Sequence, residues 1–196
     1  MVRILFGILL GIVLVALSLL GWLQFGKVPV AVADPPLPHE QLVTEIPLHA
    51  RIERELVKAP VIQPDEESLV AGATIYRDQC AACHGLHGKP STFGPHMFPA
   101  APPLWEKHHH GDEAAAAGVI GVSDDPPGET YWKVANGIRL TGMPSFKGVL
   151  TDAEMWQVSL LVANADKPLP PAAVTILRGE PLAPIPVVVG TVMKKQ

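Results

Sequence analysis

Both cysteines of the chain stand in one short motif, Cys80-Ala81-Ala82-Cys83-His84. At the end of a helix, residues three apart lie on one face. The two thiols can therefore reach the two vinyl groups along one edge of a porphyrin and form thioethers, and His84 then places its imidazole on the iron from the same side. Cys-x-x-Cys-His is the attachment signature of c-type haem. The sequence predicts one covalent haem c on Cys80 and Cys83, with His84 as an iron ligand.

Other uses of the cysteines fit the sequence less well. A thioredoxin-like redox pair needs a strand before the motif and a first thiol of low pKa, and no strand pattern precedes Cys80. A structural zinc site needs four ligands, and the chain has no second cysteine pair. Covalent haem attachment also takes place outside the cytoplasm, which agrees with the apolar N-terminus described below.

A second axial ligand has to come from elsewhere in the chain, and Met143 is the best candidate. It lies between Gly142 and Pro144, so turn chemistry rather than a helix positions it. A thioether ligand raises the reduction potential of the iron, which suits electron transfer. Met155 is expected in a helix core, and Met97 and His96 are the next candidates. The run His108–His110 is interpreted as solvated, with no role on the iron.

The N-terminus carries an uncharged run from Ile4 to Gly26, which Lys27 ends. As a helix this run would be about 34 Å long, enough for a hydrocarbon core of about 30 Å. It is longer than the usual apolar part of a signal peptide, which favours an uncleaved anchor over residues 1–27. Cleavage after Ala31-Val32-Ala33 is the alternative. Both interpretations place the rest of the chain on the outer, periplasmic side of the membrane.

Prolines divide the remaining chain, which has 21 of them in 196 residues. Residues 28–65 are expected to be a largely extended linker, with a short helix at His49–Lys58. Residues 66–166 are expected to form the folded domain, and residues 167–196 a Pro-rich tail that is loose or lies on the surface. Residues 34–166 hold nine Lys/Arg and eighteen Asp/Glu, a net charge of −9. That balance excludes a nucleic-acid binder and favours a basic partner.

Inside the domain the pattern predicts helices and one long loop. Helices are expected at about Glu66–Ala82, at Glu129–Asn136, and from Thr151, where Thr151-Asp152-Ala153-Glu154 has the form of a capping box. Gly72 lies on the apolar face of the first helix, where a small residue allows another helix to cross closely. The Gly/Pro-rich stretch between the first two helices, with a short helix around Asp112–Ala117, is long for a compact domain. A large bound cofactor would explain it.

Taken together, residues Ser68–Asp166 resemble a class I c-type cytochrome. The resemblance is close to the haem domains found in the third subunit of cbb3-type oxidases and in many membrane-anchored monohaem cytochromes. The matching positions follow the order of the chain: Gly72 and Tyr76 in the first helix, Cys80, Cys83 and His84 at the attachment site, Gly85 and Gly88 after it, Ala101–Leu104, Gly137-Ile138, Gly142-Met143-Pro144, Phe146, and Trp156 of the last helix. The stretch His108–Gly128 departs from the family.

The resemblance implies an all-α fold of three to four helices around a covalent haem, below an N-terminal transmembrane helix. It implies that a proline carbonyl, of Pro102 or Pro103, accepts the Nδ1–H of His84, with Pro103 preferred of the two. It also implies that His84 and Met143 ligate the iron. Leu104, Ile138 and Phe146, with Tyr131 or Trp132, are expected to line the pocket.

The expected function is electron transfer between redox partners that the sequence does not identify, either as a carrier or as the cytochrome subunit of a respiratory or dehydrogenase complex. No catalytic residue is assigned. A peroxidase-like haem enzyme and a haem-based redox or gas sensor are the alternatives, and both require a labile distal methionine.

Overall fold

The computed structural model describes residues 1–57, 59–107 and 119–180. Over these ranges the chain is helical and forms no β-strand, only isolated bridges such as Leu86 with Lys89. It divides into two units, Met1–Glu45 and Ile46–Gln196. The helical architecture predicted for the folded domain is confirmed.

The first unit contains α1 (Val2–Phe25), a helix in which no residue is buried. Over the described ranges, α1 is the helix long and apolar enough to cross a membrane, with a mean hydropathy of 2.8. A signal sequence near the N-terminus meets the same criteria of length and hydropathy, so α1 is a candidate for either role.

The segment expected to be extended contains a long helix, α2 (Glu40–Glu55), which begins well before the predicted short helix at His49. The carboxylate of Glu40 accepts the backbone N–H of Leu37 at 2.8 Å, which ties the start of the helix to the chain that precedes it. Pairs four residues apart, Gln41 with Glu45 and Arg51 with Glu55, support its exposed face. Pro47 removes one backbone donor from the helix without ending it.

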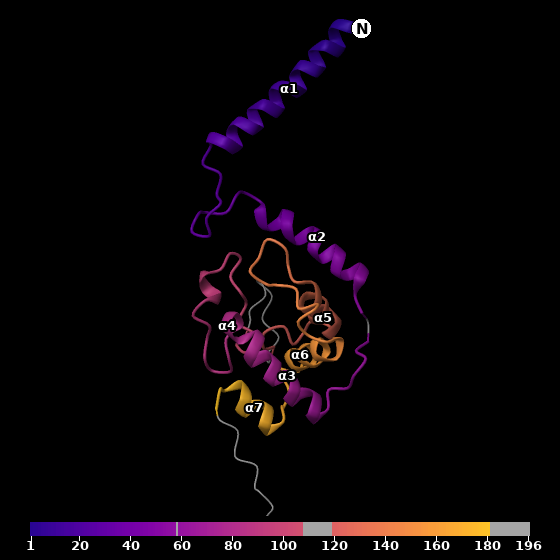
Figure 1. Ribbon diagram of the computed structural model, residues 1–196, viewed down its shortest axis with the longest axis vertical. Helices are drawn as coiled ribbons and strands as arrows, with labels where there is room; N and C mark the ends of the chain where they lie inside the picture. Colours follow the sequence, from indigo (N-terminus) through magenta and orange to yellow (C-terminus); the bar gives the residue numbers. More distant parts are fainter. Residues whose placement is uncertain (58, 108–118, 181–196) are drawn as a thin grey trace, which may run out of the picture. The chain divides into compact units, whose positions relative to one another are not determined.

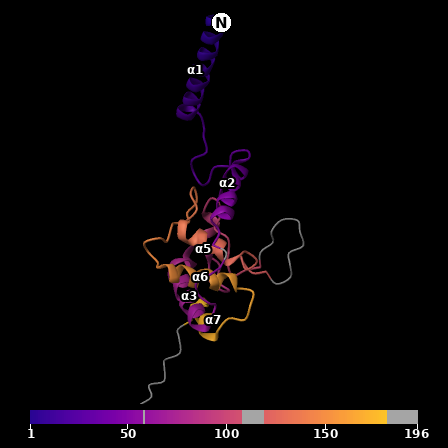
Figure 2. The same cartoon turned by 90° about the vertical axis from the view of Figure 1, so that its right-hand side faces the viewer.

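Two helices of the second unit, α3 (Glu66–Gln79) and α6 (Asp152–Ala163), cross and form the centre of the core (Figures 1 and 2). At the crossing, a Cβ on Gly72 would come closer than 3.0 Å to the carbonyl oxygen of Gln157. The predicted close approach at Gly72 is confirmed. The predicted capping box is also confirmed, because Thr151 and Glu154 bond each other's backbone N–H groups.

The remaining helices surround this crossing. α4 (Ala81–His84) follows α3 directly, and a single turn, η1 (Gly94–His96), lies in the loop after it. α5 (Pro127–Asn136) packs against α6, where the Tyr131 ring stacks on Trp156 with centroids 4.2 Å apart. The start of α6 is tied to the same tyrosine, because Tyr131 donates a hydrogen bond to Asp152.

The prediction of a loose or surface tail is wrong for residues 171–177. Pro171–Leu177 form a helix, α7, that packs against α3 (Figure 1). Ala173, Ile176 and Leu177 are almost fully buried and belong to the core. Two further contacts hold the end of α7: Lys89 Nζ donates to the carbonyl of Arg178 at 2.7 Å, and His87 N–H donates to Leu177. Prolines suggested an extended tail, yet Pro171 stands at the first position of a helix, where proline is favoured.

Some expectations fall outside the described residues. These are the run His108–His110, the short helix around Asp112–Ala117, much of the stretch His108–Gly128, and the tail from residue 181.

Candidate functional site

A cavity with a mostly apolar lining lies between α3, α4, α5, α6 and the two loops that connect them. Most of the predicted haem-contacting residues line it, whereas Pro103, Tyr131 and Trp132 do not. The lining is Tyr76, Gln79, Cys80, Cys83, His84, Met97, Pro99, Ala100, Ala101, Pro102, Leu104, Val122, Thr130, Lys133, Val134, Ile138, Thr141, Gly142, Met143, Pro144, Phe146, Val158 and Val162.

The attachment motif enters the cavity at the junction of two helices. Cys80 ends α3 and begins α4, so Cys83 and His84 follow within one helical turn. Both cysteines are free thiols that are partly buried. Burial, and next the neighbouring Cys83, raise the pKa of the Cys80 thiol to about 12, which keeps this sulfur protonated and neutral at physiological pH.

The imidazole of His84 is held by a backbone carbonyl. Its Nδ1 lies 2.8 Å from the carbonyl oxygen of Pro102, and this bond leaves Nε2 as the nitrogen available to a metal. Burial lowers the pKa of His84, and the bond to Pro102 opposes that shift only in part. The ring is therefore held neutral, which is the form that ligates iron.

The prediction that Pro103 accepts this bond is wrong, and the acceptor is Pro102. The reason lies in the next peptide unit, where the N–H of Leu104 points to the carbonyl of His84. In a trans peptide the carbonyl of residue 103 points away from that N–H, and therefore away from His84. Pro103 does not line the cavity.

The chain after His84 is fixed by Tyr76, whose buried hydroxyl donates to the carbonyl of Gly85 at 2.8 Å. Gly85 has φ +77°, in the left-handed region, and a Cβ there would press on the backbone of Lys89 and Ser91. The Trp105 ring meets Tyr76 edge-on, with centroids 5.5 Å apart. This contact packs α3 against the segment that carries Pro102.

Met143 lies in a loop closed by its own hydrogen bonds. The N–H of Ile138 donates to the carbonyl of Met143 at 3.2 Å, and the N–H of Met143 donates to Thr141 Oγ1 at 3.0 Å. At the base of the loop, Phe146 N–H donates to Val134 and Ser145 Oγ donates to Ala135. The loop therefore presents Met143 to the cavity on a fixed backbone.

Of the other methionines and histidines that the structure describes, only Met97 lines the cavity. Met97 lines the cavity, and its methyl group packs on Gly142, whereas His96 does not line it. Met155 is buried in the core of α6, away from the cavity, as expected. His39, His49 and His87 do not line the cavity either.

Leu104, Ile138 and Phe146 line the cavity, whereas Tyr131 and Trp132 do not. Tyr131 stacks on Trp156, and Trp132 faces α2. Sequence reasoning missed the valine wall formed by Val134, Val158 and Val162. A signal was present, because Val158 and Val162 are four residues apart on α6 and so share one face.

The residues of the cavity fit a haem. Two thiols, one neutral imidazole with its second nitrogen free, and one thioether are the groups needed for two covalent links and two axial bonds. Most other lining side chains are apolar, as a macrocycle with a nonpolar face requires.

The comparison with protein-family models agrees with this site. The family model "Cytochrome c" matches residues 69–166, and the chain belongs to that family. Membership implies a covalently bound haem c and haem-based electron transfer. No curated protein matches. Among solved structures, the chain is similar to a Kuenenia stuttgartiensis reducing HAO-like protein complex at 22% identity and a TM-score of 0.41, with 70% of this chain and 66% of that chain covered.

Proposed function

We propose that this protein is a membrane-anchored, monohaem c-type cytochrome that carries electrons between redox partners. The observation that supports it best is the convergence of Cys80, Cys83, His84 and Met143 on one apolar cavity. The family match supports a bound haem and a function in electron transfer. The positions of these four side chains support the role that each is given below.

Within this proposal, Cys80 and Cys83 form the thioethers, and His84 and Met143 ligate the iron. The bound haem supplies a one-electron couple between ferric and ferrous iron. Pro102 orients the imidazole, and the hydrogen-bonded loop around Thr141 keeps the sulfur in place in both oxidation states. A fixed ligand pair lowers the reorganisation that each electron transfer requires, and an apolar lining with a methionine ligand favours a raised potential.

The haem domain in this proposal extends beyond residue 166 and includes α7, because Ile176 and Leu177 complete the core. Residues 1–27 anchor it, with the domain on the periplasmic side, since α1 has the length and hydropathy of a span. The resemblance to the third subunit of cbb3-type oxidases favours a respiratory or dehydrogenase complex as the partner. The acidic balance of residues 34–166 favours a basic docking surface on that partner.

The decisive experiment compares Met143→Ala with Met155→Ala in the purified full chain. Loss of the axial sulfur should lower the reduction potential and let carbon monoxide bind the ferrous protein readily at neutral pH. Met155→Ala removes a side chain of the same type, but from the core. It should lower the stability of the protein and leave the reduction potential and carbon monoxide binding near those of the wild type. An unchanged potential in Met143→Ala would refute the assignment.

A further inference from the structure

The second half of α2 is part of the haem domain. Ile52 projects from α2 and is only 3% exposed. Just after the helix, the chain passes so close to α5 that a Cβ on Gly128 would come closer than 3.0 Å to the carbonyl oxygen of Val57. Residues 46–57, here called the docked segment, therefore belong to the same compact unit as α5 and contact it at Val57.

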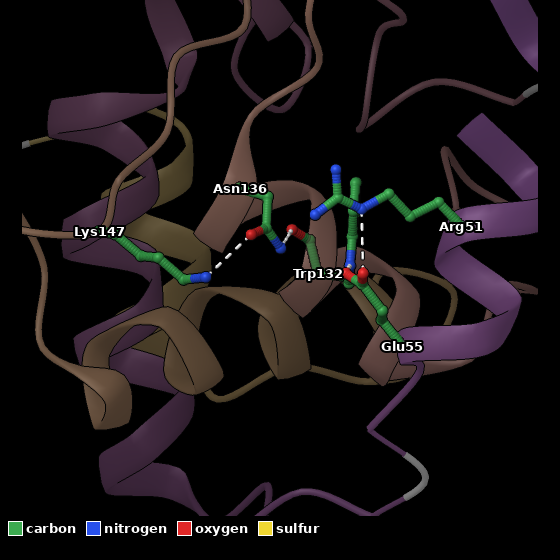
Figure 3. A network of polar contacts seen from close by, with 5 residues as sticks. All are labelled: Arg51, Glu55, Trp132, Asn136 and Lys147. Carbon is green, nitrogen blue, oxygen red and sulfur yellow. Dashed lines mark hydrogen bonds and ion pairs between the residues drawn. The ribbon is translucent and has the colours of Figure 1, made fainter. Parts of the chain in front are cut away.

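Trp132 of α5 is the polar link to the docked segment (Figure 3). Its indole Nε1–H donates to Glu55 Oε2 at 2.8 Å, and the Arg51 guanidinium lies 5.8 Å from the centre of the ring. Arg51 and Glu55 also form an ion pair at 3.0 Å. The bond from Trp132, and next that from Arg51, lower the pKa of Glu55, so the carboxylate is ionised at neutral pH.

The same tryptophan is connected to both ends of the loop that carries Met143, residues 137–146, here called the Met143 loop. The side-chain amide of Asn136 donates to the carbonyl of Trp132 at 2.9 Å, and its oxygen accepts Lys147 Nζ at 2.8 Å. Asn136 is the last residue before the loop, and Lys147 lies just after it. Figure 3 shows these residues in one chain of contacts from α2 to Lys147.

We propose that the docked segment holds the Met143 loop closed, with Glu55 and Trp132 as positioning residues for the axial methionine. Docking fixes α5, and α5 with Lys147 fixes both ends of the loop. Release of residues 46–57 then makes Met143 easier to displace, although Glu55 and Trp132 lie outside the haem cavity. This inference rests on the proposed function, because it takes Met143 to be an iron ligand.

The test is the affinity of the ferric, full-length protein for imidazole, which competes with Met143 for the iron. Glu55→Ala and Trp132→Phe each remove one partner of the 2.8 Å bond. Each should raise the imidazole affinity about two- to tenfold, the size expected for one net hydrogen bond. Lys147→Ala should act in the same direction, because it releases the far end of the loop.

Asp65→Ala is the matched control. It removes the N-cap of α3, whose side chain accepts Ser68 N–H at 2.8 Å, and touches neither the docked segment nor the loop. It should lower global stability and leave the imidazole affinity at the wild-type value. If Trp132→Phe does not fold, Glu55→Ala decides the question alone, because the Glu55 side chain is 45% exposed.

Hydrogen exchange of the α2 amides measures docking independently. Protected amides over residues 50–55 in the wild type, faster exchange in Glu55→Ala, and tighter imidazole binding would together support the inference. Faster exchange with unchanged imidazole affinity would overturn it and leave the electron-carrier proposal intact. A wild type that lacks the far-red methionine–iron band would instead overturn the assignment of Met143, and with it the proposed function.

Discussion

Gly72 of α3 lies directly against the carbonyl oxygen of Gln157 in α6, with no room for a Cβ atom between them. This contact sets how closely the two central helices approach. α3 carries Cys80 at its end, and α6 supplies Val158 and Val162 to the lining of the same cavity. The width of the haem site therefore depends on a residue outside it.

Gly72→Ala tests that dependence. In an exposed helix the change would stabilise by about 1 kcal/mol, because alanine is the better helix former. Here the added methyl group must push α6 away, and overpacking of this kind costs about 1–3 kcal/mol. Denaturant unfolding of the haem-loaded protein should show a net loss of stability. A gain of stability would mean that the helices are not in contact at this position.

The two tyrosines of the chain give a pH prediction. Burial, and next the neighbouring Cys80, raise the pKa of Tyr76 well above its usual range, and burial, then the bond to Asp152, raise that of Tyr131 to about 12. A raised folded-state pKa contributes stability that is fully present below the unfolded value of about 10 and is lost as the pH rises through the folded value. The free energy of unfolding should fall above pH 10. Tyrosinate absorbance that rises near pH 10 in the folded protein would contradict this.

Most of this arrangement could be predicted from local patterns. Local sequence is enough to predict where helices start near Glu66 and Thr151, and where two helices cross closely at Gly72. The cysteines, histidine and methionine of the cavity could be predicted from motifs. The acceptor of the His84 bond was assigned to the wrong proline because the choice depends on the direction of one peptide unit. That direction is set by the long-range bond from Leu104 to His84.

The capping box of α6 provides a stability test. Thr151→Ala removes the side-chain acceptor for the Glu154 N–H and should cost about 1 kcal/mol, measured by denaturant unfolding. The bonds from Thr151 also lower the pKa of Glu154, so part of this stabilisation is present above the ordinary glutamate pKa and is lost as the pH falls through the depressed value. In Thr151→Ala the acid-dependent part should shrink. Equal acid sensitivity in both proteins would argue against the capping box.

Replacement of the two cysteines tests the attachment chemistry. Cys80→Ala or Cys83→Ala should leave haem held by one thioether, and the double variant should lose haem to acid–acetone extraction. The measurement is covalent haem by mass spectrometry and the absorption of the pyridine adduct. Haem that stays bound through two thioethers in a single variant would contradict the use of these residues.

Predictions of extended chain that were based on prolines, in residues 28–65 and 167–196, are the least reliable. Pro47 lies inside α2, and Pro171 begins α7, although both were interpreted as signs of extended chain. A single proline removes one backbone donor. The burial of Ile52 stabilises α2, and the burial of Ile176 and Leu177 stabilises α7. Tertiary packing decided both cases, and sequence periodicity alone does not contain it.

The central claim is that His84 and Met143 ligate one covalent haem, and the absorption spectrum of the purified protein tests it most directly. The account predicts sharp c-type bands on reduction and, in the oxidised form, the weak far-red band of methionine sulfur on ferric iron. That band should disappear in Met143→Ala and persist in Met155→Ala. A high-spin spectrum, or an oxidised wild type without the far-red band, would contradict the account.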